Sequence, residues 1–507
     1  MPSTSTATRK KSSSATKQST KTRSPAKSLK AAVNSASWLA SINKGQSANA
    51  QVAYLGDTAF GAGHNISRYV LGNGLTVLVL VDRSAPVVAY QTWFAVGSRH
   101  EKPGKTGLAH LFEHLMFNET KNLPKGTFDR QLEEAGAETN AATWVDWTFY
   151  YENVPADRLS LVVGLEADRM ANLVLRDRQV SSEKEVVANE RRMRVDDDVD
   201  GTVNELLYRT VFERHGYSWP TIGWMKDIEG FTTQDCRAFY KTFYAPNNAT
   251  LCVVGDLDVT ELLREIQKAY GGMPAAKLPL EDVQPERPQT SERRVEVTQP
   301  TVAEKLVIGY RGPALGDNEH ASLTVLNEVM FGGRSSWAYI DLVRDTELAT
   351  EVRGWASTFR DPGIYEINAN SRPGVKAEQV LERIDALIER VRRDGVSQQE
   401  LDKVKARLEL ASLQGLETAG GKAEQIGFWE LITGDPAGVF RRTEQLRRVT
   451  VNDVLRAART FLDPSSRTVI LVRPDAATVA AIAAGTLSVD GDDAGDVDHE
   501  GDSRSTL

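Results

Sequence analysis

Residues 108–117 read LAHLFEHLMF, an apolar stretch that contains two histidines and one glutamate. If the stretch is helical, positions i, i+3 and i+4 project from one face, so His110, Glu113 and His114 converge on one point. Two neutral imidazoles one turn apart can chelate Zn²⁺. The chain has seven histidines among 507 residues, and at that frequency the pattern H-x-x-[DE]-H arises by chance in roughly one chain in a hundred. Two ordinary core histidines would also leave the charge of Glu113 buried at a high cost. The stretch therefore predicts a metal site.

A catalytic zinc needs a third protein ligand and keeps one position open for water. Helical periodicity in residues 181–195 predicts a second helix, which offers carboxylates. Glu183 and Glu190 are two turns apart on the same face of that helix, whereas Glu185 points elsewhere. The spacing alone leaves Glu183 and Glu190 as candidates for the third ligand.

The same stretch belongs to an internal repeat. Leu115-Met116-Phe117 returns as Val329-Met330-Phe331, 214 positions later. Residues 151–154 and 243–254 also have counterparts, at offsets of 214 and 218. Each match is weak alone, but several matches in order indicate a duplication, which has to be recognised before the fold is predicted.

The repeat shows what the second copy has lost. An offset of 214 aligns the three motif positions with Thr324, Asn327 and Glu328. An offset of 216–217 places Ala406 or Arg407 opposite Glu190. These residues cannot form a His-His-Glu ligand set. We therefore expect the second copy to keep the shell of the fold and to serve as a wall without metal.

The pattern of apolar residues predicts an α+β fold. Asn73-Gly74 lies inside an alternating stretch, which is a strong hairpin signal. Further strands are predicted at residues 86–96 and 249–254, and helices at 108–117, 127–135, 155–175, 181–195 and 259–270. Strands and helices mix without strict β-α-β alternation, so we predict two tandem homologous domains, each with helices layered on a largely antiparallel sheet. The domains are placed at residues 62–275 and 294–476, and a proline-rich linker at 276–293.

Composition excludes several classes of protein. A net charge of −8, 41% hydrophobic residues and two cysteines are typical of a globular protein and exclude a disulfide-rich scaffold. The sequence has no apolar run long enough to span a membrane. We predict a disordered, basic, Ser/Thr-rich tail at residues 1–60 and an acidic disordered tail at 486–507. The acidic body argues against a nucleic-acid partner. The first residues lack the apolar core of a secretory signal, which favours the cytoplasm over the periplasm.

The motif H-x-x-E-H at residues 110–114 is the inverted zinc motif of the inverzincins. Together with residues 97–101 and with Gly107 before the motif, it resembles the insulinase/pitrilysin family of metallopeptidases (M16), in its processing-peptidase-like branch. The resemblance assigns the distal zinc ligand to Glu190, about 76 positions after the second histidine, and a second acid of the catalytic site to Glu183.

The resemblance also implies residues that bind substrate. Asn140 and Ala141 resemble part of the family's substrate-side strand and would offer its edge to a peptide. Arg344 matches a family arginine that binds substrate or oxyanion, although Thr350 stands where the family often has a tyrosine. An ordinary sheet strand and a plain surface arginine are the alternative interpretations.

The function implied is that of a zinc-dependent endopeptidase that hydrolyses unstructured peptides inside a clamshell chamber of the LuxS/MPP-like metallohydrolase fold. His110, His114 and Glu190 would hold Zn²⁺, and Glu113 would act as general base. One chain forms one half of the clamshell, so we expect a homodimer or a heterodimer with a related M16 subunit. The alternative is a non-catalytic or partner-dependent M16 subunit with an assembly role.

Overall fold

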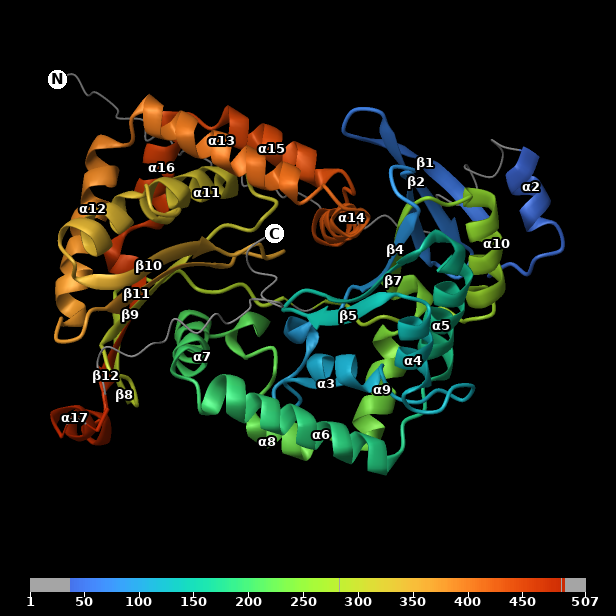
Figure 1. Ribbon diagram of the computed structural model, residues 1–507, viewed down its shortest axis with the longest axis horizontal. Coiled ribbons are helices and arrows are strands. Elements are labelled where there is room, and N and C mark those ends of the chain that lie inside the picture. Colours follow the sequence, from blue (N-terminus) through green and yellow to red (C-terminus); the bar gives the residue numbers. More distant parts are fainter. Residues whose placement is uncertain (1–36, 282, 485, 488–507) are drawn as a thin grey trace, which may run out of the picture.

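A computed structural model describes residues 37–281, 283–484 and 486–487, which form two halves, each with its own sheet (Figure 1). The N-half (residues 37–275) has the strand order β1-β2-β3-β7-β4-β6-β5. The C-half (residues 293–484) has the order β10-β11-β9-β12-β8. The strands are β1 (Val52–Phe60), β2 (His64–Leu71), β3 (Thr76–Val81), β4 (Val87–Phe94), β5 (Glu138–Thr143), β6 (Thr148–Pro155), β7 (Ala249–Gly255), β8 (Arg293–Gln299), β9 (Lys305–Arg311), β10 (Ala349–Ala356), β11 (Ile364–Ser371) and β12 (Arg467–Pro474).

The two sheets repeat one topology. Without the β1-β2 extension, the order β3-β7-β4-β6-β5 corresponds strand by strand to β8-β12-β9-β11-β10. Among the described strands, β3 pairs with β7 in parallel and β8 pairs with β12 in parallel, while the other neighbours are antiparallel. This is the arrangement that a duplication requires, and it confirms the predicted α+β fold with largely antiparallel sheets. The hairpin around Asn73-Gly74 is confirmed as the β2-β3 pair.

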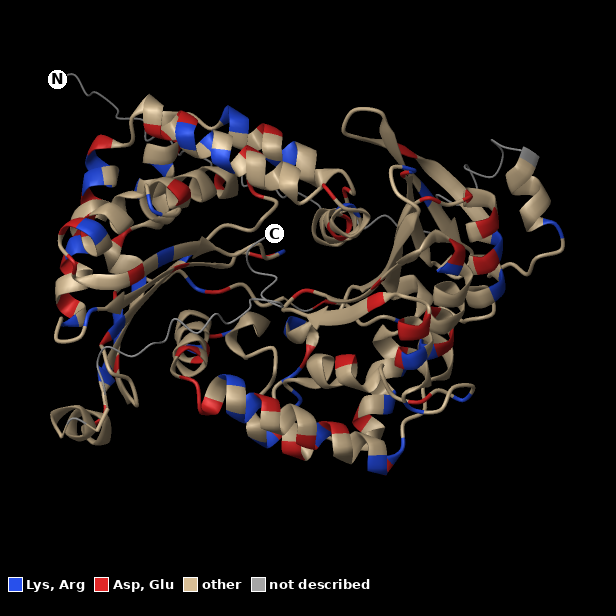
Figure 2. Cartoon of the chain, viewed as in Figure 1, with Lys and Arg blue, Asp and Glu red and all other residues tan. Residues whose placement is uncertain are grey.

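Helices of each half cover one face of its own sheet. In the N-half these are α2 (Ser37–Asn43), α3 (Leu108–Leu115), α4 (Thr127–Glu134), α5 (Leu159–Asn172), α6 (Asp177–Arg191), α8 (Met225–Gly230), α9 (Thr233–Phe243) and α10 (Val259–Tyr270). In the C-half they are α11 (Asn318–Phe331), α12 (Ala377–Asp394), α13 (Gln398–Gln414), α15 (Gly438–Arg448) and α16 (Val451–Phe461). Helix α17 (Ala476–Ala483) follows β12 and has no buried residue. Figure 2 shows charged residues of both signs along the outer helices α6, α12 and α13, whereas the strands are mostly uncharged.

The opposite face of each sheet is covered by a helix from the other half. Helix α14 (Ala419–Thr433) of the C-half packs on β4 and β7, and helix α7 (Val199–Val211) of the N-half packs on β9 and β12. Alternate strand residues therefore enter different cores: Val77 and Val79 face the helices of their own half, whereas Leu78 and Leu80 face α14. Burial on both faces explains why these strands read as continuous apolar runs.

Ion pairs hold α7 and α14 in place; we call these two helices, each of which covers the sheet of the other half, the exchanged helices. Lys422 of α14 lies 2.7 Å from the carboxylate of Asp82, which follows β3. The hydrogen bond from Lys422 lowers the pKa of Asp82 although partial burial opposes ionisation. In the other direction, Asp200 of α7 lies 2.6 Å from Lys305 of β9. Each exchanged helix is thus held by apolar burial along its length and by a charge pair with the sheet that it covers.

The two halves also meet at a buried polar cluster. Arg99, whose side chain is 3% exposed, pairs with Asp146 of the N-half, Glu281 of the linker and Asp361 of the C-half. His215 lies 3.2 Å from the same Asp361 carboxylate. A buried arginine requires such partners. Arg99, one of the residues 97–101 that carry the family resemblance, thus joins the two halves.

The prediction of a disordered tail at residues 1–60 is wrong for residues 37–60. Residues 37–43 form α2 and residues 52–60 form β1, which pairs with β2. Leu39 and Ile42 are buried, and the alternating burial of β1 supplies the apolar surface that the serine-rich composition of the segment obscured. Residues 1–36 and nearly all of the predicted acidic tail at 486–507 lie outside the described residues. No helix in the described part of the chain is both long and apolar enough to cross a bilayer.

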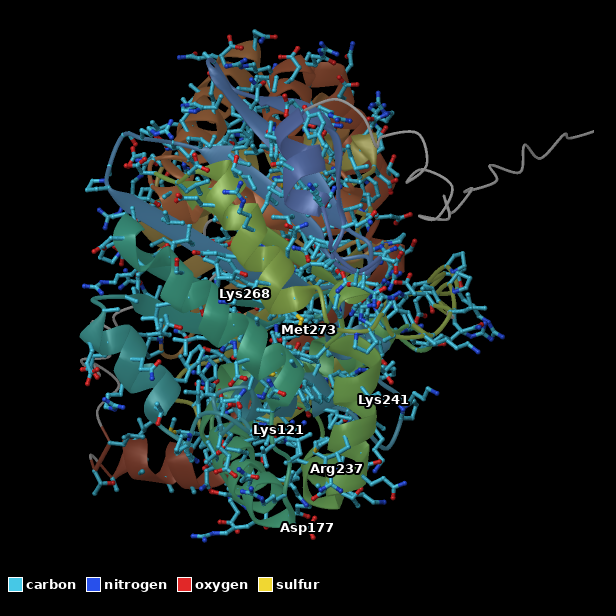
Figure 3. All side chains as sticks on the ribbon, turned by 90° about the vertical axis from the view of Figure 1, so that its right-hand side faces the viewer. Lys121, Asp177, Arg237, Lys241, Lys268 and Met273 are labelled. Atoms are coloured by element: carbon cyan, nitrogen blue, oxygen red, sulfur yellow. The ribbon has the colours of Figure 1, made fainter. Side chains whose placement is uncertain are left out.

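The outer surface of the N-half is polar. In Figure 3, exposed Lys268 on α10 and exposed Arg237 and Lys241 on α9 lie on the face turned to the viewer. These helices therefore follow the usual pattern of one apolar face toward the core and one charged face toward solvent.

The exchange of α14 makes a prediction about stability. A Cβ atom on Gly427 would lie 2.2 Å from Nε1 of Trp93 on β4, so Gly427→Ala should lower the free energy of unfolding by about 1–3 kcal/mol through overpacking. Gly164→Ala is the matched control, because Gly164 lies exposed in α5 with no neighbour within 4 Å of the added Cβ. Denaturant unfolding followed by tryptophan fluorescence measures both. Equal stability of Gly427→Ala and the wild type would contradict the close packing of α14 on β4.

Candidate metal centre

Helix α3 is held so that its polar face points away from the core. Leu108, Ala109, Leu111, Phe112 and Leu115 are buried, which leaves the motif residues on the remaining face. The first turn is capped by Glu101, whose carboxylate accepts hydrogen bonds from the N–H groups of Gly107 at 2.8 Å and Ala109 at 2.6 Å. Such capping satisfies donors that have no partner inside the helix. The role of Glu101 was not predicted, although an acidic residue shortly before the start of a helix is a signal for such a cap.

The three predicted ligands meet in space. Helix α6 brings the Glu190 Oε2 atom to 3.6 Å from His110 Nε2 and 3.4 Å from His114 Nε2. One ligand atom from each of the three lies within 4.8 Å of the others, and this is the group of metal-binding type found among the described residues. Four ligands at about 2.1 Å from a tetrahedral zinc would be about 3.4 Å apart. The two separations between the carboxylate and the imidazoles match that spacing.

The donor set fits a cation. Glu190 Oε2 is buried and has no hydrogen-bond partner among the described residues. Burial lowers the pKa of His110 to about 4, so its imidazole is neutral, which is the form that binds metal. Burial opposes ionisation of Glu190, but His114, whose Nε2 atom lies 3.4 Å away, and the other basic groups nearby outweigh it and lower the pKa of Glu190. Two imidazoles and one carboxylate are a ligand set that Zn²⁺ accepts.

Arg194 orients the carboxylate ligand. Its Nε atom lies 3.3 Å from Glu190 Oε1, one helical turn away, while Oε2 faces the two histidines. Partners of this kind fix the orientation of a metal ligand and tune its affinity. Arg194 was not among the predicted site residues, although its i, i+4 spacing from Glu190 is a signal for such a pair.

Glu113 lies beside the ligands without being one of them. Its carboxylate accepts a hydrogen bond from the Thr143 hydroxyl at the end of β5. Burial raises the pKa of Glu113, against the opposing effect of the Thr143 hydrogen bond. A carboxylate with a raised pKa suits a general base, because proton transfer is most effective when the pKa approaches the working pH. Thr143 fixes the rotamer of this side chain, a role that the sequence did not reveal.

Glu183 lies on the same face of α6 as Glu190 but outside the ligand group. It is buried, and its Oε1 atom accepts hydrogen bonds from Asn118 at 3.1 Å and Lys125 at 3.2 Å. Its charge is one of several that raise the pKa of His114, against the larger opposing effect of burial. The structure thus separates the two candidate ligands, and a catalytic role of Glu183 stays a prediction.

A cavity of about 860 Å³ extends from His110 and Glu190 toward the C-half. The structure brings the edge strand β5 beside it, with Asn140 opposite Tyr151 and Ala141 opposite Tyr150 of β6. Thr143 lines the cavity. The predicted substrate residue Arg344 lies elsewhere: it is exposed in the segment Tyr339–Asp345, pairs with Asp345 and does not line this cavity.

The corresponding place in the C-half holds an ion pair. Glu328 of α11, the counterpart of His114, lies 3.5 Å from Arg407 of α13, one of the two residues that the repeat places opposite Glu190. Asn327, the counterpart of Glu113, accepts a hydrogen bond from Tyr365 at 3.1 Å. In the second copy the two corresponding helices are therefore joined by opposite charges, at the place where the sequence predicted that no His-His-Glu set is kept.

Comparison with known proteins gives consistent matches along the chain. Residues 76–223 match the family described as Insulinase (Peptidase family M16), and residues 230–408 match the family described as Peptidase M16 inactive domain. The chain is 30% identical over 408 residues to the zinc protease PqqE of Helicobacter pylori, covering 80% of this chain and 92% of that protein. It is 25% identical over 394 residues to the uncharacterized zinc protease YmxG of Bacillus subtilis, covering 78% and 95%.

Solved structures have the same fold. A protease from Helicobacter pylori superposes with a TM-score of 0.77 at 29% identity, covering 81% of this chain and 99% of that chain. The first half of the periplasmic protease PqqL from Escherichia coli gives a TM-score of 0.68 at 19% identity, covering 84% and 95%. Against the longer PqqL structure the match covers 49% of that chain, so this chain corresponds in fold to about half of it.

The ligand assignment predicts that Glu190→Gln weakens zinc binding by more than about 100-fold, beyond the 10–100-fold usual for residues behind the ligands. The substitution removes the charge and the second carboxylate oxygen at one of three ligands. Competition with a chromophoric chelator measures the affinity. Glu185→Gln, on the exposed side of the same helix, is the control and should bind zinc like the wild type. Zinc retained by Glu190→Gln but lost by Glu183→Gln would reverse the assignment.

Proposed function

Because the chain belongs to the insulinase (M16) family of peptidases, we propose that it is a zinc-dependent endopeptidase that hydrolyses unstructured peptides or protein segments inside a clamshell chamber. The observation that carries this proposal is the convergence of His110, His114 and Glu190 on one point, with Glu113 beside them and a cavity in front. An intact ligand set in the N-half is the feature that favours catalysis over a purely structural subunit.

Each residue of the site has a role that its surroundings support. His110, His114 and Glu190 would hold the metal. A zinc ion bound there would supply a Lewis acid and a water molecule of lowered pKa. Glu113, held by Thr143, would take a proton from the attacking water and return it to the leaving amine. Amide hydrolysis by this route needs no covalent intermediate with the protein.

The substrate is proposed to enter as an extended chain. Strand β5 is the edge of its sheet, so a peptide can add to it as a further strand, beside Asn140 and Ala141. A main-chain ladder of this kind requires a segment free of its own secondary structure. Thr143 on the same strand contacts Glu113, which would bring the scissile bond and the general base together.

One chain would supply one half of the chamber. The fold match to about half of the longer PqqL chain supports this interpretation. We therefore propose a homodimer or a heterodimer with a related M16 subunit. Arg344 faces solvent in this chain, so its predicted contact with substrate would require such an assembly.

The general-base role predicts the behaviour of Glu113→Gln. The variant should keep its zinc, because Glu113 is not a ligand, and its kcat/KM should fall by about 10²–10⁴-fold. Hydrolysis of an internally quenched pool of unstructured peptides measures the activity, and metal analysis measures the zinc. Glu185→Gln is the control for the loss of a glutamate.

Retained turnover by Glu113→Gln would refute the assignment of Glu113 as the general base. If wild type and variant both bind zinc and neither cleaves, the alternative of a partner-dependent or non-catalytic M16 subunit is supported instead. Adding a related M16 subunit to the same assay then separates these two cases, since only a partner-dependent enzyme gains activity.

A further inference from the structure

The last residue of helix α6, Arg191, directly follows the candidate ligand Glu190, and only 6% of its side chain is exposed. Its guanidinium forms a bidentate pair with the carboxylate of Glu205 in α7: Nη1 lies 2.8 Å from Oε2, and Nη2 lies 3.3 Å from Oε1. Such a pair fixes the relative orientation of the two groups as well as their distance. The end of α6 that carries Glu190 is therefore bound to α7 in a defined orientation.

Glu205 is held in turn by the C-half. The apolar face of α7 is buried in one cluster with strands of the C-half sheet, and this cluster includes Val203, Leu207, Val307 and Ile470. Glu205 lies two residues from both Val203 and Leu207, and two residues of a helix correspond to a rotation of about 200°. Its side chain therefore leaves α7 on the side turned away from that sheet. The position of the Glu205 carboxylate depends on how α7 packs against the C-half.

The guanidinium of Arg191 also contacts the segment that supports α3. Its Nη1 atom donates a hydrogen bond to the carbonyl of Gly223 at 2.7 Å. Gly223 has a φ of +86°, and a Cβ atom on it would lie 2.2 Å from the carbonyl oxygen of Thr106, so only glycine fits there. Thr106 precedes Gly107, the N-cap of α3. Arg191 thus links α6 to the start of the helix that carries the two histidines.

We propose that Arg191 and Glu205 are positioning residues of the metal centre, which hold Glu190 opposite the two histidines. This inference rests on the zinc site of the proposed function and adds that the affinity for zinc depends on α7, and through α7 on the C-half. A ligand that is already in place need not be ordered when the ion binds, so binding is tighter. Arg194 orients the same carboxylate within α6, whereas Arg191 fixes the end of α6 itself.

Charge alone makes a different prediction for the same two residues. Loss of the Glu205 carboxylate would weaken the binding of a cation, because a negative charge is removed. Loss of the Arg191 guanidinium would strengthen it, because a positive charge is removed. Positioning predicts that both losses weaken binding, because either one breaks the same pair. The sign of the Arg191 effect therefore separates the two explanations.

The test measures metal affinity without turnover. Arg191→Met, Glu205→Gln and the double variant are made in the full-length protein, and zinc affinity is measured by competition with a chromophoric chelator. Each single substitution should weaken zinc binding by about 10–100-fold. The double variant should bind zinc like the weaker single variant, because the pair is already broken. With Co²⁺ in place of zinc, the visible absorption spectrum should change in the same variants, since it depends on the geometry of the ligands.

Two controls separate positioning from stability and from charge. Arg68 of β2 pairs with Glu430 of the other exchanged helix, α14, and neither residue lines the cavity. Arg68→Met should therefore leave the zinc affinity and the Co²⁺ spectrum unchanged even where the unfolding midpoint falls. Arg191→Lys keeps the charge but cannot form the bidentate pair, so it should weaken zinc binding. If the unfolding midpoint shows that Arg191→Met does not fold, Arg191→Lys and Glu205→Gln carry the test.

Zinc binding by Arg191→Met or Arg191→Lys that equals or exceeds that of the wild type would overturn the positioning role. Losses that add in the double variant would also overturn it, because the two residues would then act separately.

These outcomes are distinct from those of the proposed function. Peptide cleavage by the wild type, together with unchanged zinc affinity in the variants, would overturn the positioning role and leave the peptidase intact. Weakened zinc binding in both single variants, without cleavage by the wild type, would support the positioning role and favour the non-catalytic or partner-dependent alternative.

Discussion

The exchange of α7 and α14 between the halves is the constraint on which the remaining architecture depends. Each sheet has apolar residues on both faces, and the helices of its own half cover only one. The second face is buried only when the other half is in place. Because apolar burial is the dominant favourable contribution to folding, the relative position of the halves is fixed by their cores. Trp355 of β10 and the ligands on α3 and α6 consequently face one cavity in a defined arrangement.

Local spacing explains why most of the candidate site could be predicted. His110, Glu113 and His114 lie within two turns of one helix, so their convergence follows from helical geometry. The third ligand is harder to predict, because Glu183 and Glu190 lie on one face of α6. Only the tertiary contact of α6 with α3 shows which of the two glutamates faces the histidines. The resemblance to a family named Glu190, which the structure places beside the two histidines, whereas Glu183 accepts hydrogen bonds from Asn118 and Lys125 instead.

Contacts between segments that are distant in the chain could not be predicted from the sequence. Nothing local in residues 199–211 or 419–433 indicates that these helices pack on the sheet of the other half. The same holds for the hydrogen bond from Thr143 to Glu113, which depends on the register of β5 against β6. Strand β1 was missed because its flanking composition is polar, although its residues are buried at both ends and alternate between half-buried and exposed in the middle. The repeat, by contrast, could be recognised from the sequence, because the matching segments follow one another in the same order in both halves.

The duplication explains why the same pair of helices carries the candidate ligands in the N-half and an ion pair in the C-half. A carboxylate that is buried beside another helix must be compensated. In the N-half two histidines face Glu190, and in the C-half Arg407 faces Glu328. Both solutions hold the same pair of helices together, so loss of the metal ligands did not require loss of the fold. The C-half, without a metal ligand set of its own, lines the cavity with strand residues such as Trp355 of β10. The exchanged helices keep that strand opposite the ligands of the first copy, so neither half can form the cavity alone.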